Sequence, residues 1–121
     1  MANRELKNPF LKKLAEAFRA EKISDSLHAK LTGDHAVFHN YLIHGKTDSA
    51  NRVAISAAMS AARESGEFAA EFLVECGKDF LSKGQGKYAK KVLENALKIE
   101  EIKDDVRAKA CHMLGALHER A

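Results

Sequence analysis

The chain has 121 residues and a net charge of +3, from 20 basic and 17 acidic side chains, with one proline and no tryptophan. This length suits one compact domain, and the abundant Ala, Leu, Lys and Glu favour helix along nearly all of it. Charges of both signs are interspersed, so no polybasic region points to nucleic acid. We therefore expect a single all-α domain over residues 1–121.

Cysteine usage and hydropathy exclude several other classes. The two cysteines are far apart and form no CxxC motif, which argues against a zinc knuckle or a secreted disulfide scaffold. No apolar run approaches the ~18 residues of a membrane span, and the first residues lack a signal-peptide core. We predict a cytoplasmic protein without membrane contact.

The first 33 residues predict an amphipathic helix followed by a short one. Asn8 can cap the first helix, and Pro9 suits its first turn because the missing N–H needs no partner there. The apolar side chains recur in four-residue steps, so they form one stripe that we expect to pack on the domain. A basic membrane-surface helix is the alternative, and interspersed glutamates argue against it. The stripe consists of Leu6, Phe10, Leu14 and Phe18.

Capping residues and glycines divide the rest of the chain. Ser24 is a candidate cap for the short helix, which we expect to end before Gly33, and Gly45 closes the helix after that. Helical apolar periodicity continues to the last residues and predicts about seven helices in total. No segment shows the alternation of apolar and polar residues that is typical of a strand. The expected helices cover residues 9–22, 24–31, 34–44, 48–65, 67–82, 87–99 and 104–119.

A set of small and apolar residues recurs about every 39 positions from residue 34 onward. A repeat of paired helices at such a period predicts stacked antiparallel hairpins, because one pair alone cannot bury its apolar face. We expect the apolar residues among these positions to lie mainly in the core. The first copy has Val37, Tyr41, Ala50, Ala54 and Ala57; the second has Cys76, Phe80, Ala89, Leu93 and Ala96; a truncated third has Cys111, Leu114, Gly115 and His118.

The segment from Leu73 to Ala96 resembles a tetratricopeptide repeat. The family places apolar residues, a glycine and an aromatic on its first helix, and alanine, a bulky apolar residue and alanine on its second. This pattern is filled by Leu73, Cys76, Gly77, Phe80, Ala89, Leu93 and Ala96. The good copy covers about residues 70–103, and degenerate copies flank it.

This resemblance implies a binding face, since first helices line the concave groove in that family. By position, the groove would carry mixed polar side chains suited to a peptide or helix of a partner protein. We therefore predict a non-catalytic protein-interaction or adaptor module. The alternative for the same positions is an ordinary solvated helix face. The predicted partner-binding residues are His35, His39, Glu71, Lys78, Lys109 and His112.

Metal and enzyme chemistry have weaker support. His35 and His39 stand four residues apart on one helical face, and His28, His44 and Asp34 are near in sequence. A zinc site needs further ligands, and the sequence offers no HExxH motif or cysteine partner. The spacing singles out no catalytic constellation, and the cysteines at 76 and 111 fall on predicted core positions. We expect no enzyme, no cofactor and no metal.

Duplex DNA is the alternative partner. Residues 24–44 resemble a helix-turn-helix with its turn at Gly33, and Asn40 would then face a groove beside the two histidines. Lys30 and Lys46 could contact phosphates, whereas Asp34 places negative charge at the start of the second helix. We rank a protein partner ahead of nucleic acid.

The last helix predicts an assembly contact. Its apolar side holds Cys111, Leu114 and Leu117, with Met113 nearby, and these side chains need a cover. The N-terminal helix could fold over them, or a second chain could. Among second chains we favour a homodimer slightly over a helix from a different protein.

Overall fold

A computed structural model describes residues 8–120 of the chain. Within this range the protein is all-α, with six helices and no strand, which confirms the predicted fold class and comes close to the expected seven helices. Leu6, the first residue of the predicted apolar stripe, lies outside the described residues. The helices are α2 (Pro9–Arg19), α3 (Asp25–Ile43), α4 (Thr47–Ala61), α5 (Gly66–Ser82), α6 (Gly86–Leu97) and α7 (Asp104–Arg120).

The two predicted N-terminal caps are confirmed. Asn8 Oδ1 accepts a hydrogen bond from the Leu11 amide at 3.0 Å, and Pro9 occupies the first position of α2. Ser24 Oγ accepts from the Leu27 amide at 3.0 Å at the start of α3. Each cap supplies an acceptor to an amide that would otherwise have no partner within its helix.

The predicted break at Gly33 is wrong, because α3 runs through it as one helix. A helical glycine costs about 1 kcal/mol relative to alanine. Burying each large apolar side chain of the stripe on either side returns about 1.5–3 kcal/mol, so packing outweighs the glycine. The helix-turn-helix that the alternative hypothesis placed at residues 24–44 is therefore not formed. The buried stripe consists of Leu27, Leu31, Phe38 and Leu42.

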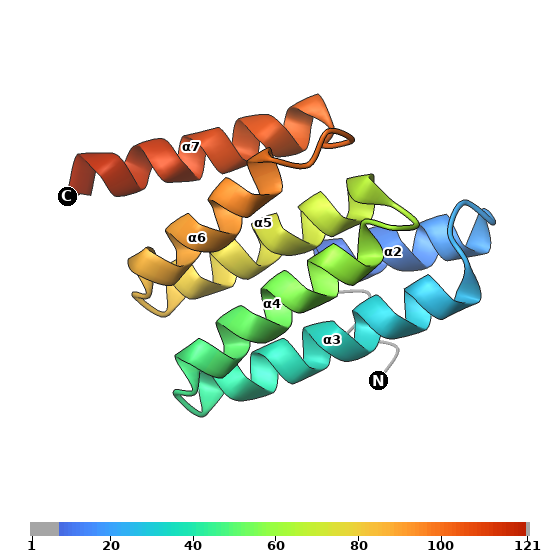
Figure 1. The fold of residues 1–121 in the computed structure, drawn as a ribbon, viewed down its shortest axis with the longest axis horizontal. Coiled ribbons are helices and arrows are strands. Elements are labelled where there is room, and N and C mark those ends of the chain that lie inside the picture. The colour runs from blue at the N-terminus through green and yellow to red at the C-terminus, as the bar shows by residue number, and fades with distance from the viewer. Residues whose placement is uncertain (1–7, 121) are drawn as a thin grey trace.

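The helices form two layers (Figure 1). One layer holds α3, α5 and α7, with α5 touching both of its neighbours, and the other holds α4 and α6. Tight turns at Gly45 and Gly84, with φ of 73° and 71°, link the antiparallel pairs α3–α4 and α5–α6. Helix α2 contacts α3 and α5 only, so it lies on the outside of the first layer.

Small residues allow close helix crossings. A Cβ added at Gly77 on α5 would lie 2.8 Å from Leu93 Cγ on α6, which is too close for a real contact. Helix α4 is buried through alanines alone, and it contacts α3, α5 and α6. Its buried residues are Ala50, Ala54, Ala57, Ala58 and Ala61.

Most predicted core residues are buried, but Val37 and Cys111 are not. Val37 is 45% exposed, while the neighbouring Phe38 is fully buried. Cys111 is exposed, while Ala110 is fully buried. The core stripe is therefore shifted by one residue from the predicted position, to the following residue at Val37 and to the preceding residue at Cys111. Phe18, Tyr41 and Leu114 are partly buried against the core.

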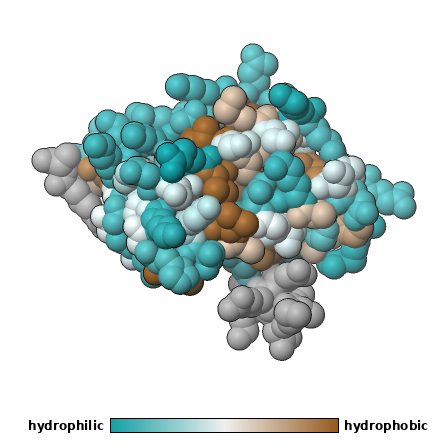
Figure 2. All heavy atoms as spheres, turned by 60° about the horizontal axis from the view of Figure 1, so that its bottom comes forward, coloured by the Kyte–Doolittle hydropathy of each residue, from teal (hydrophilic) through white to brown (hydrophobic). Residues whose placement is uncertain are grey.

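Apolar side chains also reach the surface. Figure 2 shows one face on which apolar atoms gather in a narrow stripe bordered by hydrophilic ones. The large hydrophobic side chains exposed in the described part of the chain are Val37, Ile43 and Met59. None of the helices searched there is long and apolar enough to cross a membrane.

Candidate functional site

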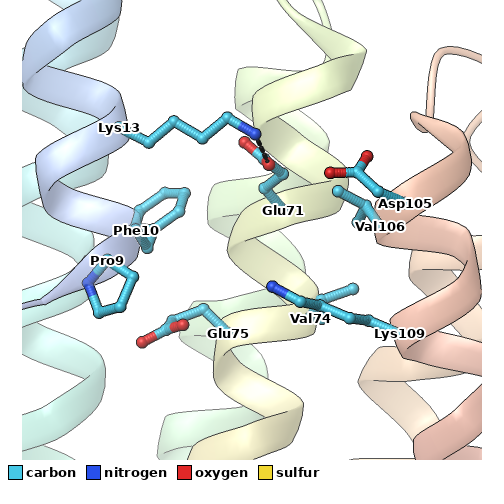
Figure 3. A pocket seen from close by; sticks show the side chains of 9 residues that line it. All are labelled: Pro9, Phe10, Lys13, Glu71, Val74, Glu75, Asp105, Val106 and Lys109. Carbon is cyan, nitrogen blue, oxygen red and sulfur yellow. Dashed lines mark hydrogen bonds and ion pairs between the residues drawn. The ribbon is translucent and has the colours of Figure 1, made fainter.

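A pocket of about 120 Å³ opens between α2, α5 and α7 (Figure 3). Its volume is below the roughly 300–1,000 Å³ typical of small-molecule sites, so it suits a single side chain rather than a cofactor. Three helices line it because α2 covers α5 on one side and α7 flanks α5 on the other. The lining residues are Pro9, Phe10, Lys13, Glu71, Val74, Glu75, Asp105, Val106 and Lys109.

Charged groups surround an apolar floor in this pocket. Lys13 on α2 reaches across to Glu71 on α5 and forms an ion pair with it (Figure 3). This hydrogen bond raises the pKa of Lys13, whereas burial raises the pKa of Glu71 more than Lys13 lowers it. Asp105 and Lys109 on α7 make no ion pair with side chains that the structure describes. Both charges are therefore available to a partner.

The structure divides the six predicted partner-binding residues into two groups. Glu71 and Lys109 meet in the pocket. Lys78 and His112 are exposed on α5 and α7. Each lies about one helical turn after a residue that lines the pocket, Val74 or Lys109, so each lies on the same face of its helix as the pocket.

His35 and His39 lie in the neighbouring part of the layer, where α2 packs. Phe10 stacks on the His35 ring with centroids 6.0 Å apart, and His35 is only 6% exposed. A partner therefore cannot reach the His35 ring while α2 is in place. His39 is half-buried one turn further along α3.

A second cluster forms where α3 packs against α5. One potential ligand atom from each of His35, His39 and Asp79 lies within 4.8 Å of the other two. Nε2 of His39 is 3.0 Å from Oδ2 of Asp79, but neither atom makes a hydrogen bond of good geometry. Nε2 of His35 is also buried without a partner. Buried polar atoms without partners are rare in folded proteins and call for an explanation.

The surroundings of this cluster set the protonation of its rings. Burial, and then the neighbouring His39, lower the pKa of His35 to about 4, so its imidazole is neutral at pH 7. The Asp79 carboxylate, at hydrogen-bonding distance, raises the pKa of His39 despite partial burial. The His35 ring is thus neutral, whereas the nearby Asp79 carboxylate favours the protonated form of the His39 ring.

The sequence did not predict Asp79 or Lys13 as site residues. Asp79 comes from α5, forty positions after His39, and no local spacing links them. One signal was present, since acidic residues repeat in four-residue steps on α5 and the two histidines share that step on α3. Asp34, the acidic residue that the sequence places beside the histidines, instead forms an ion pair with Lys30 at 3.0 Å. The acidic series is Glu67, Glu71, Glu75 and Asp79.

Comparison with protein-family models, curated proteins and solved structures finds no match for this chain.

Proposed function

We propose that this protein is a non-catalytic interaction module that binds an amphipathic helix or peptide of a partner protein between α5 and α7. The observation that supports this most is the three-helix pocket, which joins an apolar floor to unpaired charges of both signs. An apolar anchor side chain would enter the pocket, and the rim charges would select its flanking residues. The tetratricopeptide-like pattern on α5 and α6 agrees with this role.

Helix α2 illustrates how such a ligand could sit. It lies on the same layer one position away, with Phe10 and Leu14 buried and with Lys13 paired to Glu71. An amphipathic helix is therefore already accommodated between α3 and α5. The adjoining trough between α5 and α7 offers Val74 and Val106 as its apolar floor, with Asp105 and Lys109 as charged rim groups. This arrangement corresponds to helix-in-groove recognition.

Photo-crosslinking tests the surface directly. A benzophenone amino acid is placed at Lys109 in the trough and, as the control, at Lys90, which is exposed on α6 in the other layer. We expect a protein adduct from position 109 and none from position 90. Equal adducts at both positions, or adducts at position 90 alone, would reject the assigned face.

Charge reversal then tests the same surface with the purified partner. Lys78→Glu with Lys109→Glu should weaken binding at least tenfold, whereas Lys87→Glu with Lys90→Glu on α6 should change it little. The two pairs alter the net charge equally, so the comparison isolates position. Titration with duplex DNA in place of the partner tests the alternative, since phosphate contacts give a steep salt dependence.

A further inference from the structure

Three side chains from two helices converge in the first layer, beneath α2. The His35 and His39 rings lie one turn apart on α3 with centroids 4.5 Å apart, and Asp79 approaches them from α5. Ligands about 2.1 Å from one tetrahedral ion are about 3.4 Å apart. The 3.0 Å separation of His39 Nε2 and Asp79 Oδ2 is close to that value. The geometry thus needs only small side-chain adjustments to surround an ion.

The buried polar atoms of these side chains are the second observation. Nε2 of His35, Nε2 of His39 and Oδ2 of Asp79 are all buried. Nε2 of His35 has no hydrogen-bond partner among the described residues, and the other two atoms face each other at 3.0 Å without a hydrogen bond of good geometry. A buried polar atom that lacks a good partner destabilises the folded state. One cation between them would provide a partner for all three atoms at once.

The donor set indicates which cation fits. Imidazole nitrogen is a preferred ligand of zinc and related transition metals, whereas magnesium and calcium take oxygen ligands. Two histidines and a carboxylate are one of the known three-residue zinc sets, in which water fills the fourth position. The side chains of His39 and Asp79 are 38% and 19% exposed, so the cluster lies close to solvent although its facing atoms are buried.

We propose that His35, His39 and Asp79 bind a Zn²⁺ ion that joins α3 to α5. The sequence alone predicted no metal because its third ligand comes from a distant helix. The bound ion would hold the two helices at the point where Phe10 of α2 covers the His35 ring. This site is separate from the pocket proposed for partner binding, since the pocket lining includes none of the three ligands.

Calorimetric titration of the full chain with zinc chloride at pH 7.5, after removal of metal with EDTA, tests the proposal. The exposed Cys111 thiol is replaced by serine, so that it cannot bind zinc. We expect one ion per chain. His39→Gln and Asp79→Asn should each weaken binding more than about 100-fold, beyond the effect of losing an outer-shell partner. His44→Gln, which changes the exposed histidine just after the end of α3, is the matched control and should leave the affinity unchanged.

Two results would overturn the proposal. One is the absence of binding at millimolar zinc. The other is binding that persists in both His39→Gln and Asp79→Asn, which would identify an adventitious ion elsewhere. Should either variant lose its helical circular dichroism, Co²⁺ added to the unaltered chain decides. A four-coordinate visible spectrum without thiolate charge transfer supports the site, and a spectrum of fully hydrated Co²⁺ rejects it.

Discussion

The first helix layer has two troughs, and only one of them is filled. Between α3 and α5, helix α2 buries Phe10 and Leu14 and covers His35. Between α5 and α7 the corresponding space remains an open pocket with charges on its rim. One helix therefore converts a surface of the layer into an interior, where polar groups lose water and their chemistry changes. The same kind of surface yields an enclosed histidine cluster on one side and, on the other, the pocket that we propose for a partner.

The filled trough should carry most of the stability. Leu14 is fully buried, so Leu14→Ala removes buried methyl groups and leaves a cavity, and should cost about 2–5 kcal/mol of unfolding free energy. Leu117→Ala, at a partly buried leucine of α7, is the matched control and should cost clearly less. Urea denaturation at pH 7.5 measures both. Equal losses would show that α2 adds no more to stability than the edge of α7.

Enclosure of His35 should make stability depend on pH. Burial lowers its folded pKa to about 4 from 6.5, so the unfolded chain binds this proton more readily. The free energy of unfolding therefore decreases as the pH falls below 6.5 and approaches 4. We expect a decrease of about 2 kcal/mol between pH 7.5 and pH 5. Unfolding with EDTA present should show a smaller loss in His35→Gln than in the unaltered chain. If the free energies of unfolding of the two chains differed by the same amount at every pH, the prediction would be contradicted.

Helix α5 is the wall that both troughs share, and its crossing with α6 should tolerate no added side chain. A Cβ at Gly77 would lie 2.8 Å from Leu93 Cδ2, so Gly77→Ala should cost about 1–3 kcal/mol. At Gly33 a Cβ meets no atom within 4 Å, so Gly33→Ala should stabilise α3 by up to about 1 kcal/mol. Thermal unfolding should move in opposite directions for the two variants. The same sign for both would contradict the packing argument.

The smallest effect on stability is expected at the ion pair of Lys13 with Glu71, which joins α2 to α5 beside the pocket. The ion pair of Lys13 with Glu71 is half-exposed on its lysine side, and such pairs contribute at most about 1 kcal/mol. Lys13→Met keeps the aliphatic stem and should change stability by no more than that. Lys12→Met, an exposed neighbour on α2, serves as the control in the same urea titration. A loss of several kcal/mol at Lys13 alone would mean that the pair is a principal attachment of α2.

Local rules predicted most of the fold, because caps, small residues and apolar stripes act over a few residues. They failed at Gly33, where propensity suggested a break and the buried stripe from Leu27 to Leu42 required continuity. They also predicted Val37 and Cys111 as core residues, whereas the adjacent residues Phe38 and Ala110 are buried. A spacing shared between repeats does not determine how each helix is rotated about its own axis.

The sites were harder to predict than the fold. Glu71 and Lys109 were placed on one face by analogy between successive helices, and the pocket does contain both. The approach of Asp79 to the histidines depends on how α3 and α5 pack. The covering of His35 depends on where α2 docks. Neither arrangement follows from a spacing along one helix.

The attachment of α2 also has a kinetic consequence. Its polar links to α5 join residues far apart in the chain, with sequence separations of 58 for Lys13 and Glu71 and 67 for Asn8 and Glu75. The α3–α4 and α5–α6 hairpins close short loops, whereas docking α2 on α5 closes a long one and costs more chain entropy. Hairpins of this kind are expected to assemble first, with α2 joining late and detaching as a unit. Each such opening would briefly admit solvent to the histidine cluster, so the protein's least local contacts govern access to its most enclosed polar groups.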